Sequence, residues 1–449
     1  MESTLLLLKQ RPLSLFQILL WRLQGTTVLE RQLETQVQPD FKSLPVHADF
    51  LAYLKQEHQN GRQLVLVTDA PSKTAEAMAA ASGIFDSTIS TSETKDKAAL
   101  LSQRFGAKQY DYAGNGKGDS EILAAARKNI LVTSSSGVIQ AAQKRAEVEK
   151  VFPDPGPSLS VWSRVLRIYQ WPKNLLLLAP MACAHLWTDK TRLWHLILAL
   201  VAFCLCASSV YVLNDLLDLE SDRHHPKKRH RPFAAGKMPL GVGLAGAPLL
   251  LMGGFAAAAW LPVKFLIAFA LYYLLTLSYS LRLKQIALVD VLLLAGLYTL
   301  RVIAGGFATR IDVTDWLLAF SMFIFLSLAF VKRYTELQLA KYANKEKVAG
   351  RGYFTSDIEL VSTMGIGCGY LSVLVLAFYI NNPDVAKLYH RPAALWLACP
   401  VLLYWISRIW LLAHRKLLHD DPIVFTLTDK LSWLVGIIFM LIGVAASPV

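Results

Sequence analysis

An apolar segment near the middle of the chain ends in four polar residues whose spacing suits metal chemistry: Asn214, Asp215, Asp218 and Asp222. On a continuous helix, carboxylates spaced three and four residues apart line one stripe. Stacked like charges destabilise a bare helix, whereas Mg²⁺ prefers one or two carboxylates together with substrate phosphates and water. The pattern predicts a magnesium site for a diphosphate, in which the three aspartates bind the metal and Asn214 orients a metal-bound water or a donor hydroxyl.

A dense basic run follows at once, from His224 to Gly236, and includes Lys228 and Arg231. Alone, such a run is typical of a positively charged cytoplasmic loop. Beside the carboxylates it indicates more, because metal and basic side chains together can clamp a diphosphate, polarise it as a leaving group and bind a second phosphorylated substrate.

A later apolar segment carries Asp290, Tyr298 and Arg301. Asp290 and Arg301 are eleven residues apart, which places them on one helix face about 16 Å apart along the axis. Ionisable side chains inside apolar spans are usually functional. Arg301 therefore either faces a cavity or binds a structural carbonyl or carboxylate partner.

The polar segment after the next apolar run contains Lys332, Arg333 and Glu336, and is richer in Lys and Arg than in carboxylates. This composition suits several phosphate groups better than a second metal cluster. We expect Lys173, Arg231, Lys332 and Arg333 to contact phosphates.

The string from Asn214 to Asp222, with Arg231-Pro-x-x-x-Gly236 behind it, resembles the signature of the intramembrane UbiA-type prenyltransferase superfamily. The likeness covers roughly residues 160 to 449. It implies a nine-helix bundle around a central cavity open to lipid, with a metal-bound diphosphate near the cytoplasmic mouth. Members that use prenyl diphosphate carry a second aspartate-rich motif, and its aspartate pair is missing from this sequence.

Five further strings resemble one branch of the superfamily, the decaprenyl-phosphate phosphoribosyltransferases. They are Gln170-Trp-Pro-Lys-Asn174, Tyr279-Ser-Leu-Arg-Leu-Lys284, Leu300-Arg-Val-Ile-Ala-Gly-Gly306, Lys332-Arg-Tyr-Thr-Glu-Leu337 and His419-Asp-Asp-Pro422. The resemblance implies phosphoribosyl diphosphate as donor and a polyprenyl phosphate as acceptor. The complete predicted substrate-binding set is Lys173, Asn214, Lys228, Arg231, Tyr279, Lys284, Asp290, Tyr298, Arg301, Lys332, Arg333 and Glu336.

The implied reaction fits this inventory of residues. Mg²⁺ on the three aspartates would stabilise the departing diphosphate, and the lipid phosphate, already ionised, would attack the anomeric carbon of an oxocarbenium-like ribose without a strong general base. Two alternatives stay open: prenyl transfer to an aromatic or other hydrophobic acceptor, and a transporter or binding protein for lipid phosphates. His419, Asp420 and Asp421 form either a further substrate contact or a capped loop.

The elements that must position these residues are membrane-spanning helices. Of the 449 residues, 54% are hydrophobic and 18% charged, and the mean hydropathy is +0.38, which excludes an ordinary soluble globular chain. The net charge of +13 falls in short clusters between apolar runs, which favours lipid headgroups and phosphorylated substrates over nucleic acid. Nine spans are predicted, at 173–188, 193–215, 241–260, 263–281, 286–308, 314–332, 358–380, 393–413 and 430–448.

Lys and Arg concentrate in the loops after the second, fourth, sixth and eighth predicted spans. The positive-inside rule places these loops, and with them the amino-terminal region, in the cytoplasm. We therefore expect a multi-pass protein of the inner (plasma) membrane. Residues 151–172 form a linker and an interfacial helix in this prediction, and residues 173–449 the transferase domain.

Residues 1–150 indicate a soluble α/β domain of Rossmann-like type with one small parallel sheet. Predicted strands lie at 63–68, 110–113 and 129–133, and predicted helices at 71–82 and 121–128. Apolar runs within the first 25 residues are interrupted by charge and are shorter than the ~20 residues of a span. We expect helices of the soluble domain there.

This domain resembles the haloacid-dehalogenase-like phosphatases. Thr68, Lys97, Asn115 and Asp119 stand at positions that match that family's later motifs. The nucleophilic aspartate of the first motif has no counterpart, and without it no phosphoryl-enzyme can form. Either the domain is catalytically silent, or the natural chain begins further upstream and includes that strand.

Overall fold

The computed structural model describes residues 1–11, 14–37, 39–91, 96–116, 120–154, 156–348, 350–383, 389–418 and 421–446. The chain divides into two compact units. The first unit combines Met1–Leu166 with Tyr211–Gly246, and the second combines Arg167–Val210 with Ala247–Val449. The predicted carboxylate motif and its basic loop therefore belong to the same unit as the amino-terminal residues.

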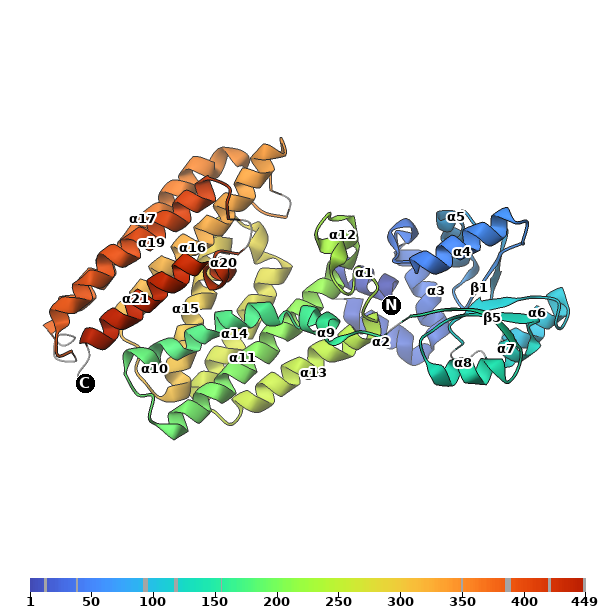
Figure 1. Cartoon of the computed structure of the whole chain (residues 1–449), viewed down its shortest axis with the longest axis horizontal. Coiled ribbons are helices and arrows are strands. Elements are labelled where there is room, and N and C mark those ends of the chain that lie inside the picture. Colours follow the sequence, from blue (N-terminus) through green and yellow to red (C-terminus); the bar gives the residue numbers. More distant parts are fainter. Residues whose placement is uncertain are drawn as a thin grey trace. The chain divides into compact units, whose positions relative to one another are not determined.

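Helices and short parallel strands alternate through most of the first unit (Figure 1). Strands β1 and β2 form one parallel pair, and β3, β4 and β5 form a second parallel sheet in that order. The elements are α1 Glu2–Gln10, α2 Leu15–Gln24, α3 Thr26–Gln36, η2 Phe41–Ser43, α4 Ala48–Gln59, β1 Val65–Thr68, α5 Ser72–Ser82, β2 Ser87–Ser90, α6 Lys97–Phe105, β3 Tyr112–Gly114, α7 Ser120–Ala125, β4 Lys128–Val132, α8 Ser136–Gln143, β5 Glu147–Phe152, α9 Leu159–Val165, α12 Leu219–His224 and η4 Lys228–His230.

The three predicted strands are present, as β1, β3 and β4, and the helix predicted at 71–82 is α5. The prediction of one sheet is wrong, because no pairing among the described residues joins β1 or β2 to the other three strands.

The sequence patterns did not predict β2 and β5. β2 has one large apolar residue, Ile89, and β5 is mostly exposed, so neither shows the run of buried residues that marks a strand. The helix predicted at 121–128 ends at Ala125 because Lys128 begins β4.

The second unit is a bundle of long apolar helices (Figure 1). Its elements are η3 Ile168–Leu178, α10 Ala179–Cys183, α11 Lys190–Leu217, α13 Leu240–Ala258, α14 Val263–Leu281, η5 Leu283–Gln285, α15 Val289–Thr309, α16 Asp315–Tyr342, η6 Thr355–Asp357, α17 Ile358–Ile380, η7 Pro392–Leu397, α19 Ala398–His414, α20 Pro422–Thr428 and α21 Lys430–Ala446. Helix α11 ends in the first unit, and α13 begins there.

Within the described residues, seven helices are long and apolar enough to span a membrane, or eight if the bent pair α20 and α21 forms one span. The nine-span prediction is therefore wrong in its count. Its first span, 173–188, is instead the 3₁₀ segment η3 followed by the five-residue α10. Two prolines, Pro172 and Pro180, interrupt regular helix formation here. The apolar side chains Leu177 and Met181 are fully buried, so this segment is apolar because it belongs to the core.

Helix α15 lies at the centre of the bundle, where it contacts η3, α14 and α16. Its residues divide between the two largest apolar clusters: Val291 and Val302 pack with α16 and α19, whereas Leu297 and Ala304 pack with η3, α11 and α14. Close packing depends on small residues, since a Cβ at Gly305 would overlap the backbone carbonyl of Leu177. The charged residues of α15 are therefore held in a tightly packed frame.

Replacing Gly305 with alanine is expected to destabilise the bundle by about 1–3 kcal/mol or more, because the backbone of η3 cannot rotate out of the way as a side chain could. The matched control is Gly296→Ala on the same helix, where an added Cβ meets nothing within 4 Å. Thermal unfolding of both variants in detergent checks this. Equal melting temperatures would contradict the close approach of η3 to α15.

Candidate active site

The three predicted metal ligands lie where α11 gives way to α12. Helix α11 ends at Leu217 and α12 begins at Leu219, so the prediction of one continuous helical stripe is wrong at Asp218. Asp215 and Asp222 are only 2% and 1% exposed. Both face Arg231 of the basic loop, whose Nη1 lies 3.1 Å from Asp215 Oδ1 and 2.6 Å from Asp222 Oδ2. Two buried carboxylates thus converge on one cationic group.

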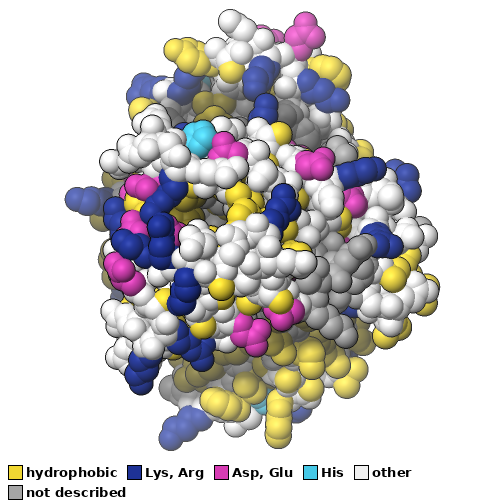
Figure 2. Space-filling view, turned by 90° about the vertical axis from the view of Figure 1, so that its right-hand side faces the viewer, with side chains coloured by type: hydrophobic (Ala, Val, Ile, Leu, Met, Phe, Trp, Pro, Cys, Tyr) yellow, Lys and Arg dark blue, Asp and Glu magenta, His cyan; other side chains and the backbone are white. Residues whose placement is uncertain are grey.

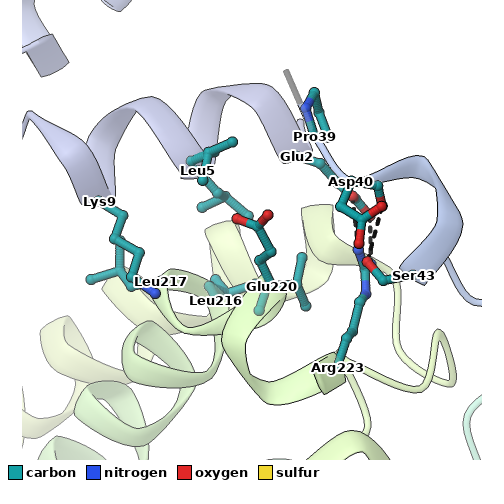
Figure 3. A pocket seen from close by; sticks show the side chains of 12 residues that line it. Glu2, Leu5, Lys9, Pro39, Asp40, Ser43, Leu216, Leu217, Glu220 and Arg223 are labelled. Atoms are coloured by element: carbon teal, nitrogen blue, oxygen red, sulfur yellow. Dashed lines mark hydrogen bonds and ion pairs between the residues drawn. The ribbon is translucent and has the colours of Figure 1, made fainter. Parts of the chain in front are cut away.

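Asp218 is more accessible and faces the amino-terminal helix α1. Its carboxylate lies 3.4 Å from the ammonium nitrogen of Lys9. One turn further along α12, Arg223 donates to both carboxylate oxygens of Glu2, at 2.9 and 2.6 Å. Figure 3 shows the pocket that α1 forms with this corner, in which Leu5 and Glu220 also take part. The amino-terminal helix is therefore ion-paired directly to the carboxylate motif.

The convergence of Asp215 and Asp222 on one guanidinium nitrogen shows that the corner accommodates a cation between two carboxylates. Mg²⁺ commonly uses one or two carboxylates, with phosphate oxygens and water completing its octahedron. Among the described residues, no group of three His, Cys, Asp or Glu side chains is gathered closely enough to hold a metal ion by itself. The residues fit a magnesium ion that shares its coordination with a phosphorylated ligand.

In the second unit, two predicted phosphate contacts meet at an aspartate. Lys173 of η3 and Lys332 of α16 place their ammonium nitrogens 3.0 and 2.8 Å from the same oxygen of Asp421. Burial alone would raise the pKa of Asp421, but Lys332 and Lys173 hold it well below its usual range. The ammonium group of Lys173 also lies 6.0 Å from the ring centroid of Tyr298. Asp421 additionally caps α20, as the capped-loop alternative predicts for this residue, and a substrate contact stays a prediction.

A second charged cluster is centred on Arg333 and Asp290, which are both fully buried. Their closest atoms are 2.7 Å apart, and Arg333 also pairs with Glu336 on the same helix. Tyr353 donates to the other oxygen of Asp290 at 2.7 Å. An ionised pair inside an apolar bundle is costly unless it is well paired. Here the ion contacts and Tyr353 offset part of that cost, while Nε and Nη2 of Arg333 and Oδ2 of Asp290 are buried without a hydrogen bond to the described residues.

The loop after α16 adds Arg351, which the sequence reading had not selected. It donates to the hydroxyl of Tyr279 at 3.1 Å and to the carbonyl of Lys284 at 3.4 Å, and it lies 3.6 Å from Glu336. Gly352 makes this approach possible, because a Cβ there would lie 2.6 Å from the carbonyl oxygen of Gln285. The sequence signal that could have identified Arg351 is the tripeptide Arg-Gly-Tyr, in which a basic residue and a phenol flank a glycine.

Arg301 is surrounded by protein partners. It donates to Tyr272 at 2.6 Å, to Asn174 at 3.0 Å and to the carbonyl of Leu297 at 2.9 Å, and it is 5% exposed. All three guanidinium nitrogens are thereby used. This geometry favours the structural alternative, in which Arg301 ties α15 to η3 and α14.

The remaining predicted residues lie near these clusters or outside the described chain. Asn214 precedes Asp215 on α11, Lys228 begins η4, and Lys284 is part of η5. Residues 419 and 420, the first two of the predicted His-Asp-Asp segment, lie outside the described residues, so only Asp421 of that segment is placed.

The phosphatase-like residues are only partly brought together. Lys97, at the start of α6, lies 2.7 Å from Asp69, the residue after Thr68. The hydrogen bond from Lys97, followed by that from Thr91, lowers the pKa of Asp69. Asn115 follows β3 in the other sheet, and Asp119 lies outside the described residues. The face viewed in Figure 2 carries Lys and Arg interspersed with Asp and Glu, which is unlike the single-sign patch of a nucleic-acid-binding surface.

A model of the UbiA prenyltransferase family matches residues 175–435, more than half of the chain. The chain belongs to this family. Uncharacterized protein y4nM of Sinorhizobium fredii is 34% identical over 92% of this chain and 81% of its own length. Nodulation protein NoeC of Azorhizobium caulinodans is 36% identical over 62% of this chain and 90% of its own. Decaprenyl-phosphate phosphoribosyltransferase of Mycolicibacterium smegmatis is 32% identical over 58% of this chain and 84% of its own length.

Membership of the UbiA prenyltransferase family confirms the predicted superfamily and a multi-pass membrane protein of transferase type. The family match includes the carboxylate motif, the basic loop and, apart from Lys173, the residues of both charged clusters around α16. The y4nM match extends over most of the residues that precede it.

Proposed function

We propose that this UbiA-family protein transfers 5-phosphoribose from phosphoribosyl diphosphate to a polyprenyl phosphate and releases diphosphate. The main support for this proposal is the group of positively charged side chains around α16 in the second unit. There, Lys173, Lys332, Arg333 and Arg351 project from three different segments of the chain. Such a collection suits substrates with several phosphate groups, of which both proposed substrates are examples. The similarity to the mycobacterial phosphoribosyltransferase supports the same choice.

The carboxylate motif would supply the metal chemistry of the proposed reaction. Asp215, Asp218 and Asp222 would hold Mg²⁺, which lowers the charge on a diphosphate leaving group when bound. Arg231 already shares its guanidinium with two of these carboxylates, and it would turn to the diphosphate oxygens once the metal takes its place. Lys228 lies in the same basic loop and would add a further phosphate contact.

The bond changes balance without an added acid or base. The C1–O bond between ribose and diphosphate breaks, the diphosphate leaves with both electrons, and a lipid phosphate oxygen forms the new bond to C1. Because that oxygen is ionised at neutral pH, no residue must remove a proton from it. The chain's own task is to position two polyanions and stabilise charge in a water-poor site.

Prenyl transfer to a hydrophobic acceptor is the rival that the family itself suggests, and donor competition separates the two. Purified protein in lipid nanodiscs receives Mg²⁺, polyprenyl phosphate and either phosphoribosyl diphosphate or geranylgeranyl diphosphate, and released diphosphate is measured. We expect release only with phosphoribosyl diphosphate, and only when the lipid phosphate is present. Release with the prenyl donor alone would refute the proposed donor, and release with neither would favour a lipid-phosphate transporter or binding protein.

The contact between Lys9 and Asp218 predicts a modest dependence of metal binding on α1. Replacing Lys9 with glutamine removes a cation that competes for the carboxylate, so the Mg²⁺ concentration for half-maximal activity should fall by up to about fivefold, as expected for a partly exposed pair. A magnesium titration of diphosphate release checks this. An unchanged or higher requirement would show that Lys9 does not compete with the metal.

The amino-terminal α/β region, which we place in the cytoplasm, carries no phosphatase activity in this proposal. Asp69 is the acidic residue closest to the predicted motifs, but its carboxylate is bound to Lys97 and Thr91. Such binding lowers the nucleophilicity of a carboxylate. The full-length protein should therefore hydrolyse p-nitrophenyl phosphate no faster with Mg²⁺ than the Asp69→Asn variant does.

A further inference from the structure

Helix α2 presents an apolar face to the outside of its own unit. Phe16, Leu19, Leu20 and Leu23 are 69%, 51%, 57% and 86% exposed. Their spacing of three, four and seven residues puts all four on one stripe. Ile18 lies on the opposite side, buried against Leu7 of α1 and Leu33 of α3. The helix is thus packed by one side and leaves on the other a stripe of large apolar side chains that are each at least half exposed.

The residues and helices of the same unit indicate that lipid covers the exposed face of α2. The same compact unit contains the end of span α11 and the start of span α13, so it is joined to the membrane at two places. Helix α1, the partner of α2, reaches this membrane end: the methyl carbon of Met1 lies 3.6 Å from the position of a Cβ on Gly241, at the start of α13. Figure 3 shows α1 above the corner of α11 and α12, with Glu2 and Arg223 joined.

Charge on the helix pair completes the pattern of an interfacial helix. Arg11 follows the last residue of α1, and Arg22 stands beside the apolar stripe of α2. Cationic residues beside large apolar side chains favour the boundary between anionic headgroups and acyl chains, where the apolar face is buried without spanning the bilayer. Ten residues are too few to span it in any case.

We propose that α2 lies in the cytoplasmic membrane interface, with Phe16, Leu19, Leu20 and Leu23 inserted among the lipid acyl chains. This is a second mode of membrane attachment, independent of the spans and of the proposed reaction. It also gives the amino-terminal region a mechanical role, because α2 anchors α1, and α1 holds the carboxylate corner through Glu2 and Lys9.

Photo-crosslinking of the full-length protein tests this directly. p-Benzoylphenylalanine replaces Leu20 in protein reconstituted into vesicles of phosphatidylethanolamine and phosphatidylglycerol, and the irradiated protein is analysed by mass spectrometry. We expect phospholipid adducts at Leu20, in at least about tenfold excess over the same label at Gln59, an exposed position on α4. A crosslink to a second copy of the chain, or equal lipid labelling at both positions, would overturn the proposal.

A second variant excludes a misfolded α2 as the source of the signal. Gln17 lies at the polar edge of the same helix and is exposed. The label at Gln17 should give clearly fewer lipid adducts than the label at Leu20, since the two side chains point about 60° apart around the axis. Equal yields at the two positions would show that α2 has no fixed orientation in the interface and would contradict the inserted stripe.

Discussion

Replacing Asp218 with alanine is expected to lower phosphoribosyl transfer by at least about 100-fold while the protein still inserts and folds. Asp218 is the accessible member of the three aspartates and pairs only weakly with Lys9, so its loss leaves the buried contacts of Arg231 intact. The proposed loss of one magnesium ligand removes several kcal/mol of stabilisation from the leaving group, and each factor of ten in rate corresponds to about 1.4 kcal/mol. The assay is diphosphate release in nanodiscs.

Glu220→Ala is the matched control for this variant. Glu220 is an acidic residue of α12, two positions after Asp218, and it is not one of the three aspartates predicted to bind the metal. It should retain activity within about twofold of wild type, since its removal changes surface charge alone. Normal turnover by Asp218→Ala, or an equal loss in both variants, would contradict a specific metal-binding role for Asp218.

The second large effect is expected at Asp421. One carboxylate oxygen of Asp421 forms ion pairs with both Lys173 and Lys332. The Asp421→Asn variant therefore leaves two neighbouring ammonium groups without their shared negative charge. Breaking a buried charged contact of this kind costs about 2–5 kcal/mol. We expect the KM for phosphoribosyl diphosphate to rise by about 10- to 100-fold, because the lysines separate and no longer present one phosphate site. The KM for the donor is measured at saturating lipid phosphate.

Asp429→Asn is the appropriate comparison. Asp429 pairs with Arg408 at 2.7 Å in the same part of the chain, away from the lysine pair. That variant should lower the melting temperature without changing the KM for the donor. If Asp421→Asn lowers this KM instead, the carboxylate competes with substrate and does not position the lysines, and the proposed phosphate site is wrong.

Much of the fold and of the candidate site could be predicted from local sequence patterns. Most long helices could be located from hydropathy, and the sites from charges placed inside or beside apolar runs. Asp290 is predicted from charge inside an apolar span and Arg333 from a polar segment rich in Lys and Arg, and the structure brings the two into contact. The family was predictable because its motif is short and contiguous.

The features that could not be predicted from the sequence depend on contacts between segments that are far apart along the chain. The segment 173–188 is apolar because it is buried in the bundle, and hydropathy alone does not distinguish that from a span. The pairing of Asp421 with Lys173 joins residues almost 250 positions apart, and no local pattern specifies it. For Arg301 the sequence left a cavity role and a structural role open, because its partners Asn174 and Tyr272 are uncharged and distant in sequence.

Transfer of radiolabelled ribose to the lipid distinguishes phosphoribosyl transfer from prenyl transfer. Protein in nanodiscs is given phosphoribosyl diphosphate labelled with ¹⁴C in the ribose, together with decaprenyl phosphate and Mg²⁺, and the organic-phase radioactivity is counted. Phosphoribosyl transfer predicts label in the lipid fraction that requires protein, lipid phosphate and metal and is lost in Asp218→Ala. Label that stays entirely in the aqueous phase while the same preparation transfers a prenyl group would contradict it.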